Sequence, residues 1–315
     1  MTEMQSIWSY DPNFPLAITG TILYGILTII IGYQTIFLYR SWFFLPVVFG
    51  AVIEVVGYAM RAYSTQNQME IVCIPAQWPP VPNSDTMGHS APFAVTLSLV
   101  VLAPVFVAAG NFLLVGRLVR AVLPPSRHTI FGLPARFITR FFVTCDVMAF
   151  CIQGSGSGTA TGSNWMGPAG AIGVNIIIAG LVFQFVAFSA YMCVFVRFHM
   201  TARKAAVQDA AVGWMNVVMS VYISSSMIMI RCIYRVAEFA EGMEGYAFKN
   251  EWMFWVFECI PMLIAIGVFC WWHPSRYLGR DGAKGMITNK SGESTEGSEL
   301  AQQTQEYERM GSPRA

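Results

Sequence analysis

Seven stretches of about 20 mostly apolar residues recur along this sequence, and they limit its possible folds more than any other feature. A helix of that length crosses a hydrocarbon core roughly 30 Å thick, where lipid offers the backbone no hydrogen-bond partners. Charged residues make up only 12% of the chain, against about 25% in typical soluble proteins. The sequence therefore predicts an all-α, polytopic membrane protein with seven transmembrane helices, at residues 16–39, 43–63, 92–119, 138–154, 169–196, 214–237 and 251–272.

Lysine and arginine are concentrated in alternate connections between these stretches. The connection after the first stretch contains Arg40, and those after the third, fifth and seventh contain several lysines or arginines. By contrast, 64–91 and 155–168 contain none, and 238–250 contains only Lys249. Short loops rich in lysine and arginine stay in the cytosol. We therefore predict a short extracellular N-terminus, a seven-helix domain and a disordered, polar cytosolic tail, at residues 1–15, 16–272 and 273–315.

Two connections on the predicted outer side have sequences that argue against helix. Residues 64–91 contain Trp78-Pro79-Pro80, so we expect this segment to form an extracellular cover. The glycine-rich run from Gly154 to Gly158 is not followed by the Lys and Ser or Thr of a phosphate-binding loop. We interpret it as a flexible hairpin.

Ionisable side chains inside the predicted spans are the main candidates for function. Such groups cost several kcal/mol in lipid, so they usually face the interior of a helix bundle and mark pathways or sites. The deep or near-deep residues of this kind are Glu54, Arg61, Asp146, Arg231, Arg235, Glu238 and Glu258. Four acids face three arginines, which leaves one acid without a partner. The alternative to a functional site is that these groups only pair with one another and hold the helices together.

The order of the charges suggests specific contacts. Glu54 precedes Arg61 by seven residues in the second span, and Arg231 precedes Glu238 by seven in the sixth, which runs in the same direction. We therefore predict the pairs Glu54–Arg231 and Arg61–Glu238, with Arg235 left to meet Glu258 or a lipid phosphate.

The remaining acids suggest a binding cavity. Neither Asp146 nor Glu258 has an arginine at its own depth on its own helix. We predict that both line a polar cavity that opens outward and accepts a cationic headgroup, with Gln153 as a hydrogen-bonding neighbour.

Several functional classes are excluded. A net charge of +1 and the absence of nucleic-acid motifs argue against DNA or RNA binding. The histidines lie in loops or at span ends, which disfavours zinc or haem sites in the bundle. No span contains the lysine that retinal needs, and no Walker motif is present. We expect no cofactor and no enzymatic activity. G-protein-coupled receptors are a rival class, but the third span ends in Val115-Gly116-Arg117-Leu118 without their acid-Arg pair.

Taken in order, these motifs resemble the fungal RTA-like family, also called lipid-translocating exporters. The motifs that carry the resemblance are Tyr10-Asp11-Pro12, Glu54-Val-Val-Gly57-Tyr58-Ala-Met-Arg61, Ala103-Pro104, Gly116-Arg117, Asp146 through Gln153-Gly154, Gly180-Leu181-Val-Phe-Gln184, Arg231-Cys-Ile-Tyr234-Arg235-Val-Ala-Glu238, Glu251 and His273-Pro274. The sequence departs from that pattern at Asn111, Trp255 and Glu258. The resemblance implies seven spans, a plasma membrane or endomembrane location, and a role in moving or resisting amphiphiles such as sphingoid long-chain bases. It also adds Gln184 to the candidate binding residues.

Two functional hypotheses follow. In the first, the protein transports an amphiphilic lipid toward the outer leaflet, and its partners are membrane lipids or amphiphilic small molecules. In the second, it is a membrane sensor of such lipids that signals through its cytosolic loops. A purely structural role ranks third.

Overall fold

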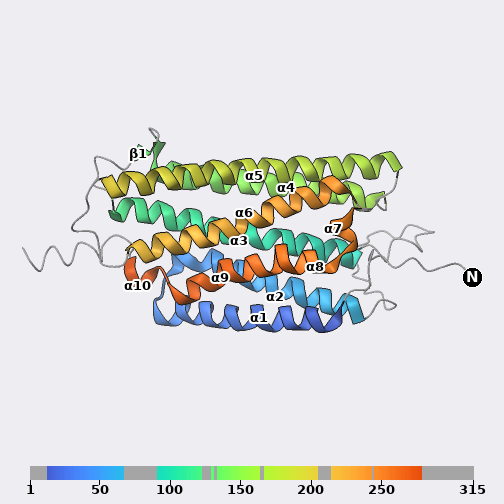
Figure 1. The fold of residues 1–315 in the computed structure, drawn as a ribbon, viewed down its shortest axis with the longest axis horizontal. Helices are drawn as coiled ribbons and strands as arrows, with labels where there is room; N and C mark the ends of the chain where they lie inside the picture. Colours follow the sequence, from blue (N-terminus) through green and yellow to red (C-terminus); the bar gives the residue numbers. More distant parts are fainter. Residues whose placement is uncertain are drawn as a thin grey trace, which may run out of the picture.

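The chain folds into an all-α membrane protein with seven helices long and apolar enough to cross a bilayer (Figure 1). The structure is a computed structural model that describes residues 13–66, 91–122, 129–130, 133–163, 167–204, 214–242 and 245–278. The first six spans are α1 (Phe14–Tyr33) with the π-helical turn η1 (Gln34–Leu38), α2 (Leu45–Gln66) after the 3-10 turn η2 (Trp42–Phe44), α3 (Ala91–Val122), α4 (Ala135–Gly162), α5 (Gly167–Lys204) and α6 (Trp214–Glu241). The seventh combines α8 (Glu251–Phe254), the π-helical turn η4 (Trp255–Cys259) and α9 (Ile260–Trp271). All seven predicted spans are confirmed.

Short elements complete the fold. The strands β1 (Thr129–Ile130) and β2 (Leu133–Pro134) form an antiparallel pair between α3 and α4, and α7 (Tyr246–Lys249) precedes the seventh span. The last described helix is α10 (Ser275–Leu278), and His273 before it is buried. The fold therefore extends past residue 273, where the tail was predicted to begin. The rest of that tail and most of the predicted cover at 64–91 lie outside the described residues.

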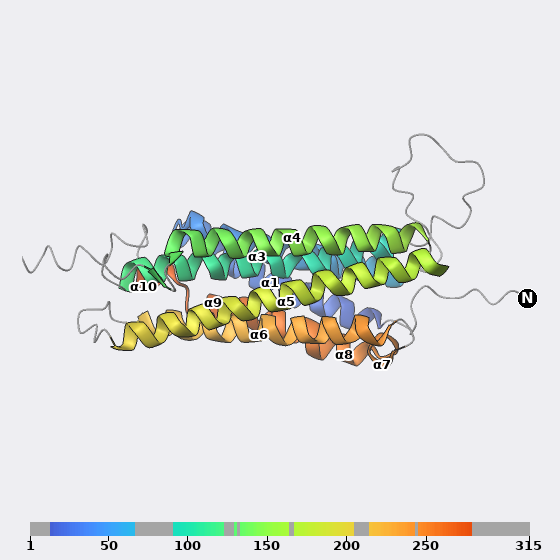
Figure 2. The same ribbon diagram turned by 90° about the horizontal axis from the view of Figure 1, so that it is seen from above.

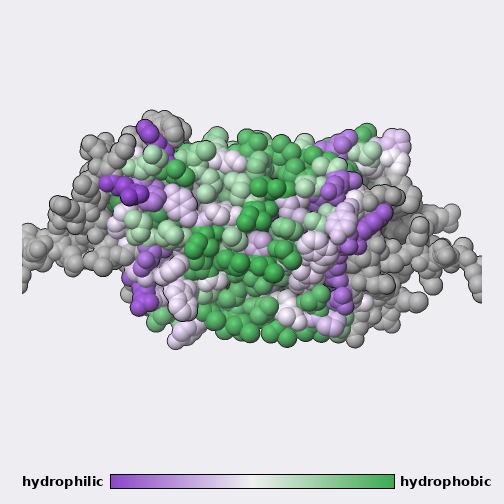
Figure 3. All heavy atoms as spheres, in the orientation of Figure 1, coloured by the Kyte–Doolittle hydropathy of each residue, from purple (hydrophilic) through white to green (hydrophobic). Residues whose placement is uncertain are grey.

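The helices form a closed ring. Each span packs against the next along the chain, and α1 closes the ring by packing against both α2 and α9, while α3 also touches α6 across the middle. We call the end where α1 begins the N-terminal side of the bundle. On the face shown in Figure 3, hydrophobic side chains form a broad middle belt, with hydrophilic residues toward both ends. This pattern fits a bilayer around the belt.

The glycine-rich end of α4 is helical, so the predicted hairpin is wrong. Glycine is a poor helix former in water, but in lipid every backbone group must be satisfied within the helix. The glycines also let two helices approach closely, because a Cβ on Gly156 would lie 2.8 Å from the carbonyl oxygen of Gly173. The helix α4 therefore continues to Gly162 and packs closely against α5.

The helix α5 is tilted between its two neighbours. Figure 2 shows it beside α4 on the N-terminal side and beside α6 at the other end. On the N-terminal side the glycines of α4 and α5 pack against each other. At the other end α5 packs against α6, where the ring centroids of Phe195 and Tyr222 are 4.6 Å apart. The tilt separates α5 from α6 on the N-terminal side.

Candidate functional site

A buried cluster of four charges joins α6 to the seventh span. Arg231 Nη2 donates a hydrogen bond to Glu258 Oε1 at 2.9 Å, and Arg235 Nη2 donates to the same oxygen. Arg235 Nη1 also donates to Glu238 Oε2 at 2.8 Å. Each of the four residues is at most 5% exposed. Two positive and two negative groups balance here, and we call these four residues the central ion cluster.

A wide helical turn positions Glu258 in this cluster. Glu258 belongs to the π-helical turn η4, which ends two residues before Pro261. Proline lacks an N–H, and its ring clashes with the carbonyl one turn earlier, so a regular α-helical turn is disfavoured there. The Tyr24 hydroxyl of α1 donates to the Cys259 carbonyl at 2.8 Å and ties α1 to this turn. Such π-helical turns often occur at functional sites.

A second ion pair lies on the N-terminal side of the bundle. Arg61 Nη2 on α2 donates to Glu251 Oε1 on α8 at 3.3 Å. The Arg61 guanidinium also lies over the Phe254 ring, 4.0 Å from its centroid, which is a favourable cation–π distance. Glu251 Oε2 accepts a hydrogen bond from the backbone N–H of Asn13 at 2.9 Å. This pair therefore links α1, α2 and the seventh span.

The two ion pairs predicted between the second and sixth spans are wrong. Arg231 binds Glu258 instead of Glu54, and Arg61 binds Glu251 instead of Glu238. In the ring α2 packs against α1 and α3, whereas α6 packs against α3, α5 and α9. Arg231 lies within electrostatic reach of Glu54, but its guanidinium binds Glu258. Arg235 does contact Glu258, one of the two partners expected for it.

Two further carboxyl groups are buried inside the bundle. Glu54 on α2 is 1% exposed and Asp146 on α4 is 2% exposed. Among the described residues, none forms a hydrogen bond with any of their four carboxyl oxygens. The sequence predicted one acid without a partner, and the structure leaves two, because Arg61 is paired with Glu251. A bare carboxylate at this depth costs several kcal/mol, so each acid must carry a proton or meet a cation.

A pair of amides lies above Asp146, one heptad along α4. Gln153 Nε2 donates a hydrogen bond to Gln184 Oε1 of α5 at 3.0 Å, and both side chains are buried. Gly180 makes room for this bond, because a Cβ there would lie 2.7 Å from Gln153 Cγ. Seven helical residues rise about 10.5 Å, so the amide pair lies that far from Asp146 toward the N-terminal side.

Two cavities lie on the N-terminal side of the bundle and share the side chain of Phe239. The first, the α4 cavity, has a volume of about 60 Å³ and is lined by Val101, Phe150, Gln153, Gly154, Ser157, Ile177, Leu181 and Phe239. The amide pair therefore borders this cavity through Gln153. Its other lining residues are mostly apolar.

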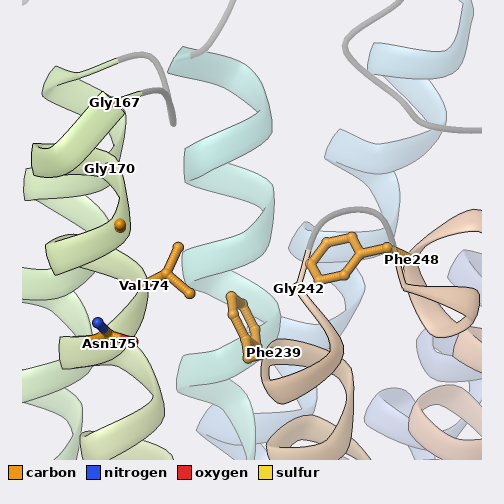
Figure 4. Close-up of a pocket in the computed structure, with 8 residues that line it drawn as sticks. Gly167, Gly170, Val174, Asn175, Phe239, Gly242 and Phe248 are labelled. Carbon is orange, nitrogen blue, oxygen red and sulfur yellow. The ribbon is translucent and has the colours of Figure 1, made fainter.

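The second cavity is larger and lies between α5, α6 and α7. We call it the α7 cavity; its volume is about 280 Å³, near the lower end of the roughly 300–1,000 Å³ of small-molecule pockets. Its lining residues are Gly167, Gly170, Ala171, Val174, Asn175, Phe239, Gly242 and Phe248. In Figure 4 Val174 of α5 points toward Phe239 of α6, and Phe248 lies beyond the end of α6 at Gly242. The cavity occurs where the tilt of α5 parts it from α6.

Some features of the site were not predicted from the sequence. Glu251 lies one heptad before Glu258 on the same helical face, but the sequence predicted no partner for it, and the structure pairs it with Arg61. No comparable signal identified Phe239 and Phe248, because their meeting depends on the turn at Gly242, whose φ is +75°. Within the described residues, no group of three or more His, Cys, Asp or Glu side chains could hold a metal ion.

Comparisons with known proteins agree with the resemblance seen in the sequence. The sequence model of the family described as RTA1 like protein matches residues 47–281. Protein RTM1 of Saccharomyces cerevisiae is 33% identical over 234 residues, which cover 73% of this chain and 67% of that protein. Protoporphyrin uptake protein 1 of the same organism is 27% identical over 84% of this chain and 90% of its own length. The Saccharomyces cerevisiae protein named sphingoid long-chain base transporter RSB1 is 22% identical over 84% of this chain and 72% of its own. No solved structure matches the chain.

Proposed function

Because this chain belongs to the RTA1-like family, we propose that it transports amphiphilic lipids across the bilayer toward the outer leaflet, with single-chain amines of the sphingoid-base type as its substrates. One relative is named as a transporter of sphingoid long-chain bases and another as a protoporphyrin uptake protein. Both names concern amphiphilic molecules. They support transport, rather than catalysis, as the role of this chain.

The observation that carries the proposal is the position of Asp146. Its carboxyl group is buried in the bundle with no hydrogen-bond partner among the described residues. The amide pair Gln153–Gln184 lies about two turns nearer to the N-terminal side and borders the α4 cavity. An ammonium headgroup can exchange its hydration for the Gln153 amide oxygen and then for the Asp146 carboxylate. These residues would form a polar path for the headgroup.

The α7 cavity supplies an apolar site for the rest of the lipid. Its lining combines the small residues of α5 with two phenylalanine rings, and Asn175 is its one amide side chain. Phe239 separates it from the polar path, so a lipid tail in the α7 cavity would lie next to a headgroup at Gln153. Glu258, predicted to line the cavity, is instead held by two arginines and has a smaller part in the proposed path.

We assign the N-terminal side of the bundle to the outside and the plasma membrane as the location. The lysine and arginine asymmetry of the loops supports this direction. Both cavities would then open toward the outer leaflet.

The alternative is a lipid sensor that binds the same molecules without moving them. Purified protein in liposomes with a fluorescent sphingoid base separates the two functions. A transporter increases the rate at which the probe moves between the leaflets, compared with empty liposomes, and a membrane-impermeant quencher measures that rate. Saturable binding with no increase in this rate would contradict transport and support the sensor.

A further inference from the structure

Glu54 is a buried acid that is not part of the proposed lipid path. Its side chain is 1% exposed, and its two carboxyl oxygens form no hydrogen bond to described residues. The ionisable groups close enough to interact with it electrostatically come from three other spans and from its own helix: Tyr24 on α1, Tyr58 on α2, Arg231 and Arg235 on α6, and Glu258 and Cys259 on η4. Arg231 is the cation that acts on it most strongly, yet its guanidinium binds Glu258.

The charges around Glu54 indicate that it is neutral in this arrangement. The central ion cluster already balances two arginines with Glu238 and Glu258. A carboxylate at Glu54 would add one negative charge beside Glu258, without a hydrogen bond and away from water. A buried ion of this kind is far more costly than its protonated form. The structure therefore corresponds to the protonated state of Glu54.

Loss of that proton would favour a different set of pairs. A negative Glu54 competes with Glu258 for Arg231, and Glu258 can give up that bond because Arg235 also donates to its Oε1. Arg235 would then hold Glu258 and Glu238 together, while Arg231 neutralises Glu54. Each of the three carboxylates would then contact a guanidinium, with Arg235 shared between Glu258 and Glu238.

We propose that Glu54 is a proton-binding site and that release of its proton moves the Arg231 guanidinium from Glu258 to Glu54. The O–H bond of the Glu54 carboxyl breaks and the proton passes to water, while one N–H···O hydrogen bond is exchanged for another. The link to lipid movement rests on the proposed transport function. The exchange frees one acceptor position on Glu258 in the central ion cluster. Lipid movement would then respond to a proton gradient.

Infrared spectroscopy of the purified full-length protein tests the proton site without any transport. Protonated carboxyl groups absorb at a carbonyl frequency separate from those of carboxylates and amides. We expect wild-type protein to show such absorption and to lose part of it as the pH rises. In Glu54→Gln the titrating absorption should be smaller than in wild type, because only Asp146 among the two unpartnered acids remains. The control Asp146→Asn should keep the part that comes from Glu54, and the double variant should lose both parts. A titrating band that is unchanged in Glu54→Gln, or present only in variants that retain Asp146, would overturn the proposal.

A second measurement tests the link to lipid movement. The probe is a fluorescent single-chain lipid with a trimethylammonium headgroup, whose fixed charge prevents trapping by pH itself. If one proton is exchanged for each lipid moved, a difference of one pH unit across the liposome membrane corresponds to about 1.4 kcal/mol. Such a difference should shift the ratio of probe in the inner leaflet to probe in the outer leaflet by up to about tenfold. Glu54→Gln mimics the protonated state, so it should still move the probe but lose this shift.

The two measurements separate the two proposals. An equal shift in wild type and Glu54→Gln would overturn the proton link and leave the transport function intact. If wild type moved no probe in any gradient, the transport function would fail, and the infrared titration alone would decide whether Glu54 binds a proton. Should Glu54→Gln fail to fold, Glu54→Asp replaces it, because it should keep a titrating band with a shifted midpoint. An unshifted midpoint in Glu54→Asp would count against Glu54.

Discussion

The close packing of α4 against α5 can be tested with two matched glycine substitutions. A Cβ on Gly173 would lie 2.6 Å from the backbone nitrogen of Ala160 and 2.8 Å from the carbonyl oxygen of Gly156. Ordinary contact begins at 3.4 Å, so in Gly173→Ala the helices must move apart by about 0.8 Å. Gly158→Ala is the control, because a Cβ on this helical glycine meets nothing within 4 Å.

Both variants gain the same intrinsic helix preference, about 1 kcal/mol for alanine over glycine. The difference between them therefore isolates the steric conflict, which should be about 1 to 3 kcal/mol against Gly173→Ala. Thermal unfolding in detergent can be followed with a thiol-reactive dye, because Cys145, Cys232 and Cys259 are buried. We expect Gly158→Ala to melt at or above the wild-type temperature and Gly173→Ala below the control. Equal melting temperatures for the two variants would refute the close approach of the helices.

Three further predictions concern the ion pairs, the π-helical turn and the topology. Glu258→Gln should lower the free energy of unfolding by about 3 to 5 kcal/mol, because two buried arginines lose a charged partner. Glu251→Gln should lower it less, since the Glu251 side chain is 10% exposed. Equal losses for the two variants, measured by thermal unfolding in detergent, would contradict this prediction. Tyr24→Phe should cost about 1 to 3 kcal/mol in the same assay, because it leaves the buried Cys259 carbonyl without its donor; an unchanged melting temperature would count against that bond. Protease added to intact cells should remove a tag at the N-terminus and spare one at the C-terminus, and the opposite result would reverse the assigned orientation.

The sequence was sufficient for the number and order of the spans, because lipid requires long apolar helices and leaves few alternatives. It failed for the end of α4, where the glycines from Gly154 to Gly158 suggested a hairpin. The contact that favours helix there, Gly156 against Gly173, lies between two spans and cannot be read from either one alone. Local composition therefore gave the wrong answer at a place decided by tertiary packing.

The buried charged residues show that the sequence also failed where the answer depends on packing between helices. The sequence identified the buried ionisable residues, since their cost in lipid depends only on position along a span. It did not give their partners, because these depend on which helices are neighbours in the ring. Arg61 meets Glu251 across α2 and α8, a contact that spacing within one helix does not reveal. Glu54 and Asp146 could be identified as the buried acids without a hydrogen-bond partner among the described residues only when the other pairs were known.

The most direct test of the account is to compare two lipids in liposomes containing wild type or Asp146→Asn. The lipids are fluorescent single-chain molecules that differ only in an ammonium or a hydroxyl headgroup. If Asp146 receives a cationic headgroup, Asp146→Asn should slow the ammonium lipid by about tenfold or more, equivalent to about 1.4 kcal/mol, and leave the neutral lipid nearly unchanged. The same loss for both lipids, with normal melting of the variant, would contradict the proposed role of Asp146 and the headgroup path built on it.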